Sequence, residues 1–216
     1  MSTLILIDLD GTVLNTPHFE AWRNTALKIG GTELTRNEYI DHIAGRPRME
    51  GASRLLELKR DVQGQGALHS LSASELSAYK QNEFQRLCVG TELFSDALRL
   101  LQRIDDARQP VIFYTASQNA ADLFDITLHQ SAFSLTQPKT VSQQSANQKR
   151  VELFKQLIGT RAAMDVHLID DSPYAADLAC RLGIHAWQIR RNQGEPRAND
   201  PRVSILSSLD EFMLPR

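Results

Sequence analysis

A chain of 216 residues is long enough for one full hydrophobic core, or for one core with a smaller inserted domain. Hydrophobic residues make up 42% of the chain and charged residues 23%, which is ordinary for a globular protein and excludes a disordered or fibrous class. The net charge of −2 gives no general attraction to nucleic acid or to an anionic membrane surface, so neither is expected as a partner.

Two cysteines, Cys88 and Cys180, lie far apart in the sequence and show no metal-ligand spacing. We expect both to be buried free thiols in a reducing compartment, which predicts a cytoplasmic protein. The apolar stretch at the start of the chain is too short to span a bilayer, and acidic residues follow it at once. The sequence therefore predicts neither a signal peptide nor a membrane anchor.

The first predicted element is a strand, because residues 4–7 form an unbroken apolar run that suits burial on both faces of a parallel sheet. Asp8 and Asp10 follow this run. A buried carboxylate without a partner is costly, so these acids are expected at the edge of the sheet, paired with a cation. Gly11 then allows a sharp turn, because glycine adopts backbone angles closed to other residues. Ligands bind at the C-terminal ends of parallel strands, so Asp8 and Asp10 are candidate site residues.

Residues 16–89 show helical periodicity and no convincing strand. Pro17 suits a helix start, and Thr35 with Glu38 three residues later is typical of a capping box. Further helices are predicted over residues 49–58 and 72–87, with a loop over residues 63–67 between them. An all-helical insert predicts a cap domain over residues 16–89, with hinges near residues 14–17 and 88–92. Residues 1–15 and 90–216 then form the core domain.

Strands and helices alternate in the remainder of the chain. Helices are predicted over residues 95–104, 119–129 and 147–158, from Pro173, and over residues 208–213. Strands are predicted over residues 111–115, 166–169, 186–189 and 203–206, with a further short strand within residues 139–142. This alternation indicates right-handed crossovers and predicts a doubly wound, mostly parallel, Rossmann-like α/β sheet.

Polar side chains end the predicted strands at three places: Asp8 with Asp10, Thr115, and Asp170 with Asp171. If these ends converge on one crevice, they offer the groups that phosphoryl transfer requires. A carboxylate can attack phosphorus only when the repulsion between two anions is screened, and a divalent cation bound to both does this. Magnesium prefers a few carboxylate oxygens together with water and phosphate oxygens, so Mg²⁺ is the expected cofactor.

The sequence Asp8-Leu9-Asp10-Gly11-Thr12-Val13 after an apolar strand resembles the first motif of the haloacid dehalogenase superfamily. Its members are mostly magnesium-dependent phosphatases with an aspartate nucleophile. The resemblance implies that Asp8 attacks phosphorus to form an aspartyl-phosphate, and that Asp10 handles the protons. It also implies metal binding by Asp8 and by the backbone carbonyl of Asp10.

Two further stretches resemble motifs of the same superfamily. Tyr114-Thr115-Ala116-Ser117 resembles the second motif, which implies that the Thr115 hydroxyl and the Ala116 backbone N–H bind the phosphoryl oxygens. The acidic pair resembles the fourth motif, which implies that Asp171 is a direct metal ligand and Asp170 a second or water-holding ligand. The third motif is a single lysine. Lys149 fits its place before the acidic strand, and Lys139 is the alternative.

The predicted cap carries a narrower resemblance. The stretches around His18 and Gly45-Arg46-Pro47-Arg48 resemble β-phosphoglucomutase, in which an arginine after a cap glycine holds the phosphate remote from the reaction. This implies substrate contacts by Arg48, and by His18 and Lys80 as weaker candidates. The expected substrate is a small phosphorylated molecule, over which the cap is expected to close.

Three functions are consistent with these features. The leading interpretation is a magnesium-dependent phosphatase acting on a small phosphomonoester. A sugar phosphomutase is the alternative enzyme, although Asn15-Thr16 departs from the acid-hydroxyl pair common there. A non-catalytic binding protein on the same fold would be indicated by loss of Asp8 or Asp10, and both are present. Dehalogenation is disfavoured, because that reaction does not use the acid/base residue Asp10.

Overall fold

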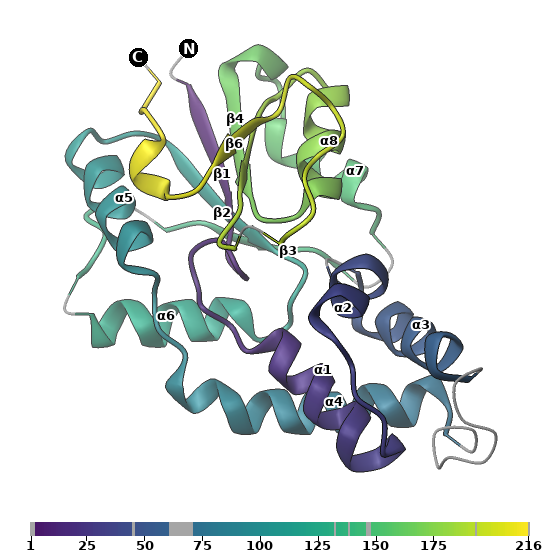
Figure 1. The fold of residues 1–216 in the computed structure, drawn as a ribbon. Helices are drawn as coiled ribbons and strands as arrows, with labels where there is room; N and C mark the ends of the chain where they lie inside the picture. Colours follow the sequence, from purple (N-terminus) through teal and green to yellow (C-terminus); the bar gives the residue numbers. More distant parts are fainter. Residues whose placement is uncertain are drawn as a thin grey trace. The chain divides into compact units, whose positions relative to one another are not determined.

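The structure is a computed structural model that describes residues 3–44, 46–60, 71–131, 133–137, 139–145, 148–192 and 194–215. The chain divides into two compact units (Figure 1). Unit 1 contains Met1–Asn15 and Glu92–Arg216, and unit 2 contains Thr16–Thr91. The loop predicted over residues 63–67 lies outside the described residues.

Unit 1 is built on a six-stranded sheet in the order β3-β2-β1-β4-β5-β6, in which every neighbouring pair is parallel. The strands are β1 (Leu4–Asp8), β2 (Val111–Thr115), β3 (Val141–Gln143), β4 (Val166–Asp170), β5 (His185–Ile189) and β6 (Ser204–Leu206). The central strand β1 lies between β2 and β4, so the order of the strands reverses there. The doubly wound parallel sheet predicted from the sequence is confirmed.

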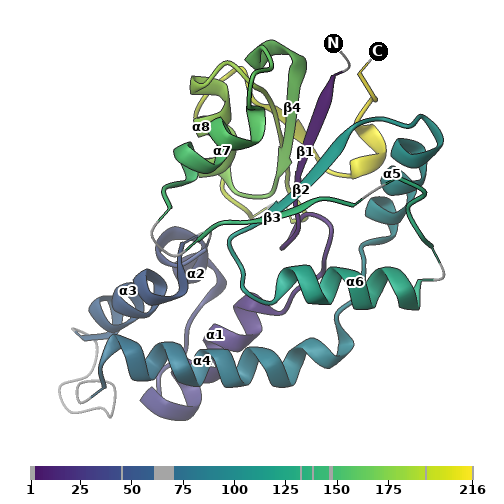
Figure 2. The ribbon, with the colours of Figure 1, turned by 180° about the vertical axis from the view of Figure 1, so that it is seen from behind.

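Helices cover both faces of this sheet (Figures 1 and 2). One face packs against α5 (Ser95–Asp106) and α6 (Ala120–Gln130), and the other against α7 (Arg150–Ile158) and α8 (Pro173–Arg181). Short 3₁₀ turns are η2 (Cys88–Gly90), η3 (Ala163–Asp165) and η4 (Leu209–Glu211). Burial of each large aliphatic side chain in these layers contributes about 1.5–3 kcal/mol.

The alternation of side chains along β1 determines which face its last residue joins. Ile5 and Ile7 pack on the side of α5 and α6, whereas Leu4 and Leu6 pack on the side of α7 and α8. Successive strand residues point to opposite faces, so Asp8 falls on the α7 and α8 side. The register pairs Asp8 with Tyr114 of β2.

The regular structure in the described residues of unit 2 is helical. Its helices are α1 (His18–Gly30), α2 (Arg36–His42), α3 (Arg48–Arg60) and α4 (Ala73–Leu87). The capping box predicted at Thr35 is present: the Glu38 backbone N–H donates to Thr35 Oγ1 at 3.3 Å, and the Glu38 carboxylate accepts from the Thr35 N–H at 2.8 Å. A small apolar core around Trp22, Leu55 and Leu76 holds the helices together.

Two predicted elements differ from those observed. The helix expected from residue 147 begins at Arg150, because Lys149 is extended and its backbone N–H donates to the Glu152 carboxylate at 3.1 Å. The closing helix expected over residues 208–213 is a single 3₁₀ turn. There the Leu209 N–H donates to Asp96 at 2.8 Å, so the segment is bound to α5 instead of continuing as a helix.

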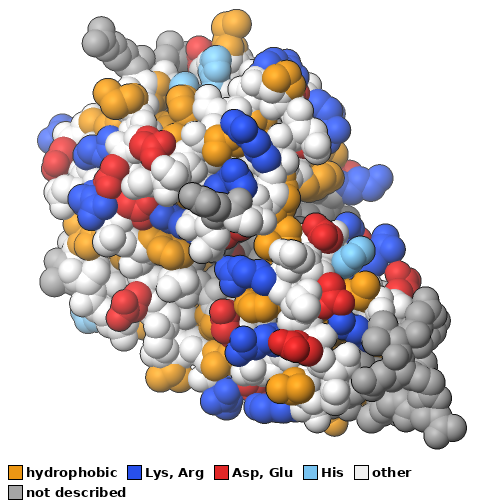
Figure 3. Space-filling view, in the orientation of Figure 1, with side chains coloured by type: hydrophobic (Ala, Val, Ile, Leu, Met, Phe, Trp, Pro, Cys, Tyr) orange, Lys and Arg blue, Asp and Glu red, His pale blue; other side chains and the backbone are white. Residues whose placement is uncertain are grey.

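The surface carries charges of both signs. On the face shown in Figure 3, basic and acidic side chains are intermingled, consistent with the small net charge. Cys180 is buried and Cys88 is partly exposed, and both are free thiols. Among the described residues, no helix combines the length and apolar character needed to cross a membrane.

We expect His167 to make stability depend on pH. Its ring stacks on His185 at 4.9 Å, and its Nδ1 accepts from Trp187 Nε1 at 3.3 Å. Burial, and then repulsion by His185, lower the pKa of His167 below its ordinary value of 6.5. Protonation of His167 therefore favours the unfolded chain. The stability contributed by neutral His167 is present above about pH 6.5 and is lost as the pH falls through the pKa of His167 in the folded protein.

The measurement is the free energy of unfolding in denaturant between about pH 7.5 and pH 5.5. The wild type should lose more stability across this range than His167→Gln. Equal losses in the two proteins would contradict the prediction.

Candidate active site

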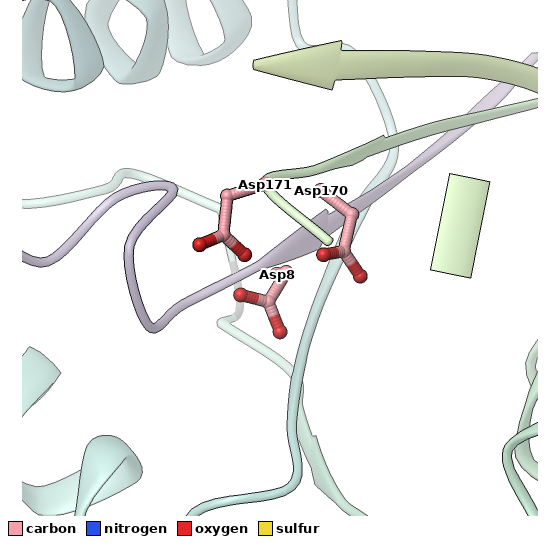
Figure 4. Close-up of side chains that lie close together, drawn as sticks. All are labelled: Asp8, Asp170 and Asp171. Carbon is pink, nitrogen blue, oxygen red and sulfur yellow. The ribbon is translucent and has the colours of Figure 1, made fainter. Parts of the chain in front are cut away.

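Three carboxylates meet at the C-terminal edge of the sheet. Asp8 ends β1, Asp170 ends β4, and Asp171 follows it. One oxygen from each lies within 4.8 Å of the others (Figure 4). Asp8 and Asp170 are buried, whereas Asp171 is more accessible to solvent. Ligands of doubly wound sheets bind outside the strand ends where the strand order reverses, and this cluster lies between β1 and β4 at that point.

The loop after β1 packs directly against the end of β4. Gly11 has φ +78°, and a Cβ atom added there would collide with the Asp171 carboxylate. Thr12 is fully buried, and its Oγ1 accepts from the Asp171 backbone N–H at 3.0 Å. Glycine is required at position 11 for both its backbone angle and its lack of a side chain.

The cluster concentrates negative charge. Burial raises the pKa of Asp8 well above its ordinary value, and repulsion by Asp170, Asp171 and Asp10 raises it further. Burial also raises the pKa of Asp171, with repulsion led by Asp170. Within the described part of the chain, no hydrogen-bond donor contacts the Asp8 carboxylate. The negative charge of Asp8 and Asp171 is therefore not balanced by the positive charge nearby.

Asp170 differs from the other two acids because donors surround it. Its Oδ2 accepts from the Tyr114 hydroxyl at 2.5 Å and lies 3.4 Å from Arg150 Nη1, while its Oδ1 accepts from the Ser172 backbone N–H at 2.7 Å. The Arg150 side chain is only 10% exposed. Arg150 also lowers the pKa of Asp8, although burial and the acids outweigh it.

Neither Tyr114 nor Arg150 was a predicted site residue. The only sequence signal for them was their position: Tyr114 precedes the predicted site residue Thr115, and Arg150 follows the predicted site residue Lys149.

The two lysines considered from the sequence lie in different surroundings. Lys149 is exposed at the start of α7. Lys139, the alternative, forms an ion pair with Asp125 of α6 and lies 5.3 Å from the Phe124 ring. Among the described residues, the basic side chain that contacts the acidic cluster is that of Arg150, which follows Lys149 in the sequence. Phosphate binding by Lys149 stays a prediction.

The end of β2 contacts Asp10. Thr115 is fully buried, and its Oγ1 donates to Asp10 Oδ2 at 2.8 Å while accepting from the Ser117 backbone N–H at 2.8 Å. Ala116 is exposed at this turn. A threonine hydroxyl has one proton to donate, so in this arrangement it serves Asp10. The structure thus brings together Asp8, Asp10, Thr115, Asp170 and Asp171, and their roles in catalysis stay predictions.

The three predicted substrate residues of the cap are associated with one face of α4 in unit 2. Lys80 is 3% exposed, its Nζ lies 2.8 Å from His18 Nδ1, and the His18 ring stacks on Phe84 at 4.3 Å. Arg48 Nε donates to Ser77 Oγ at 3.0 Å, and its Nη1 contacts Gln81. Lys80 of α4 is therefore contacted by His18 of α1, and Arg48 of α3 is bound to the same helix through Ser77 and Gln81.

The donor set of the acidic cluster fits a hard divalent cation. Such ions take carboxylate oxygens and keep several waters, and the accessible Asp171 provides a route for exchange with solvent. The unbalanced charge on Asp8 and Asp171 is the second sign of fit, because a bound cation would relieve the repulsion that raises their pKa values.

No protein-family model matches the sequence, and no curated protein matches it significantly. Solved structures match almost the whole chain. A β-phosphoglucomutase from the archaeon Pyrococcus sp. strain ST 04 is 20% identical with a TM-score of 0.66, covering 98% of this chain and 95% of its own. CbbY from Rhodobacter sphaeroides, in complex with phosphate, is 18% identical with a TM-score of 0.71 and coverages of 98% and 96%. A haloacid dehalogenase-like hydrolase from Streptococcus pneumoniae is 17% identical with a TM-score of 0.71 and coverages of 97% and 96%. This chain therefore has the fold of haloacid dehalogenase-like hydrolases over nearly its entire length.

Proposed function

We propose that this chain is a magnesium-dependent phosphatase that hydrolyses a small phosphomonoester through an aspartyl-phosphate on Asp8. The observation that carries the proposal is the convergence of the Asp8, Asp170 and Asp171 carboxylates at the strand-order reversal. Asp10 lies beside this cluster: its charge repels that of Asp8, and its carboxylate accepts a hydrogen bond from Thr115. Unit 1 is then the catalytic core, and unit 2 is the helical cap.

Asp8 is the nucleophile. Its carboxylate is buried and no donor among the described residues occupies its lone pairs, so an oxygen is free to attack phosphorus. Asp8 and Asp171 would hold Mg²⁺ directly, together with the backbone carbonyl of Asp10 that the motif implies. Both oxygens of Asp170 already accept hydrogen bonds, which supports a water-holding role for it. The bound cation would screen the repulsion between carboxylate and phosphate.

Asp10 moves the protons. When an Asp8 oxygen bonds to phosphorus, the bond from phosphorus to the leaving oxygen breaks, and protonated Asp10 donates its proton to that oxygen. Ionised Asp10 then takes a proton from water. The water oxygen bonds to phosphorus, the bond to Asp8 breaks, and inorganic phosphate is released. The hydrogen bond from Thr115 at 2.8 Å orients the Asp10 carboxyl for both steps.

Phosphate is held by fixed donors around the strand ends. Ala116 is exposed at the turn after β2, and its backbone N–H is the proposed donor to a phosphoryl oxygen. Lys149 is the predicted ammonium of this cradle. The contact of Arg150 with Asp170 supports a separate role for its guanidinium, as the charge that offsets Asp170 within the cluster.

A second anionic group on the substrate would suit the cations of unit 2. CbbY from Rhodobacter sphaeroides was solved with phosphate, and a variant of it with xylulose-1,5-bisphosphate. Arg48 offers a planar guanidinium for such a group, and Lys80 with His18 offers further donors. These residues are the proposed specificity determinants.

A sugar phosphomutase is the second candidate, favoured by the likeness to β-phosphoglucomutases. A panel of phosphomonoesters, assayed with Mg²⁺ and with EDTA, separates the two. Phosphate release that needs Mg²⁺ supports the phosphatase, and conversion of a sugar 1-phosphate to its 6-phosphate supports the mutase. Inactivity on every substrate, with no effect of Mg²⁺, would indicate a binding protein.

Asp8→Asn should lower kcat by at least about 10³-fold, because an amide cannot form the acyl phosphate. Asp10→Asn should lower kcat by about 10²–10⁴-fold, through loss of proton transfer, while Mg²⁺ affinity changes little. Steady-state phosphate release and calorimetric Mg²⁺ titration measure the two effects. Substantial activity in Asp8→Asn would show that the nucleophile is another residue.

Mg²⁺ should stabilise the protein against unfolding even without substrate. At ten times its Kd the gain is roughly 1.4 kcal/mol, or about 3–6 °C in Tm for a chain of this size. Asp171→Asn should abolish most of this shift, and Asp122→Asn, which changes an exposed acid of α6, should leave it intact. An equal shift in all three proteins would place the cation elsewhere.

Arg48→Ala should raise KM by about 10-fold or more for substrates with a second phosphate, because a charge-assisted contact is lost. Substrates with a single phosphate should be affected much less. Arg46→Ala is the matched control, since Arg46 is exposed and pairs only locally with Glu50 at 2.6 Å. A uniform change of KM across all substrates would argue against the proposed contact.

A further inference from the structure

The two segments that join unit 1 to unit 2 are paired with each other inside unit 1. The chain leaves unit 1 after Asn15 and returns at Glu92. The Asn15 N–H donates to the Glu92 carbonyl at 2.9 Å, the Phe94 N–H donates to the Val13 carbonyl at 3.0 Å, and Leu14 forms an antiparallel bridge with Leu93. The loop that carries Asp10 therefore continues directly into this pair of segments.

Arg191, two residues after β5, contacts both segments at once. Its Nη2 donates to the Thr12 carbonyl at 2.5 Å on the outgoing side. On the returning side, its Nη1 donates to Asp96 Oδ2 at 2.6 Å and its guanidinium carbon lies 3.9 Å from the centre of the Phe94 ring. The Arg191 and Asp96 side chains are 16% and 9% exposed. Breaking a largely buried pair of this kind leaves an uncompensated charge.

Thr12 links this contact to the acidic cluster. Its hydroxyl accepts from the Asp171 N–H at 3.0 Å, and its carbonyl accepts from Arg191. It lies two residues after Asp10 and four after Asp8. The backbone between the attacking carboxylate and the segment pair is thus held by β4 on one side and by Arg191 on the other.

We propose that Arg191 is a positioning residue that holds the loop after β1, which follows Asp8 and carries Asp10, through the Thr12 carbonyl. The proposal rests on the proposed phosphatase function. Arg191 touches neither the Asp8 nor the Asp10 carboxylate, so it acts by limiting the movement of the backbone that follows them at Thr12. A displacement of about 1 Å at reacting groups can lower a rate by about 10²-fold.

Arg99 provides the matched control. Like Arg191, it forms an ion pair that ties α5 to another element: it pairs with Asp210 of η4 through two hydrogen bonds of 2.9 and 2.6 Å. Asp96, the partner of Arg191, accepts from Leu209 of the same turn. Arg99 makes no described contact with the loop after β1, so a purely structural effect should appear in both variants.

The experiment compares Arg191→Gln, Arg191→Lys and Arg99→Gln with the wild type. Arg191→Gln should lower kcat by about 10–100-fold with KM within about threefold, Arg191→Lys should be intermediate, and Arg99→Gln should keep wild-type kcat. Amide hydrogen exchange over residues 9–14 should be at least about 10-fold faster in Arg191→Gln and unchanged in Arg99→Gln. If Arg191→Gln does not fold, Arg191→Lys decides the question by both measurements.

Wild-type kcat and wild-type exchange in Arg191→Gln would overturn the proposal. Parallel losses of kcat and Tm in Arg191→Gln and Arg99→Gln would overturn it too, because they would show a general structural effect. If the wild type itself has no phosphatase activity, the exchange of residues 9–14 alone decides whether Arg191 holds the loop. Failure of the proposed function and failure of this inference are therefore distinguishable.

Discussion

Repulsion between three carboxylates within 4.8 Å of one another is the constraint on which the site depends. Ionised acids this close oppose folding unless each is compensated in some way. Asp170 is compensated by Tyr114, Arg150 and a backbone N–H. Asp171 is not compensated in this way, and burial with repulsion led by Asp170 raises its pKa. Burial and repulsion by the neighbouring acids likewise raise the pKa of Asp8. The two poorly compensated carboxylates are therefore the proposed nucleophile, Asp8, and the proposed metal ligand Asp171, and a divalent cation is the natural source of the missing charge.

The geometry of the sheet explains why these particular side chains meet. Parallel strands present their C-terminal ends at one edge, and alternation sends Asp8, Tyr114 and Asp170 toward the face covered by α7 and α8. Arg150 is the first residue of α7, so its side chain approaches the acids from that layer. The apolar residues that precede the acids on β1 fix the strand in the core, which makes the strand ends a rigid base for a site.

The segments after the strands supply the second set of constraints. Thr12 ties the loop after β1 to Asp171, and the buried Gln188 of β5 donates to the Asp171 carbonyl at 3.1 Å and to the Pro196 carbonyl at 2.9 Å. Arg191 ties the same loop to the start of α5. Residues outside the acidic cluster thus hold the backbone that carries the acids.

Local pattern was sufficient for much of this protein. The apolar run before Asp8, the capping box at Thr35 and the alternation of strands with helices identified the sheet, most helices and the acids at the strand ends. What it left out depends on contacts between distant residues. Tyr114 and Asp170 are 56 positions apart, and Arg191 and Thr12 are 179 apart. Periodicity along the chain records which face a residue occupies within its own element. The register between strands and the helices packed on the sheet decide which polar groups meet. The contact of Arg150 with Asp170, and that of Lys139 with Asp125 instead, therefore depend on the folded arrangement and not on local pattern.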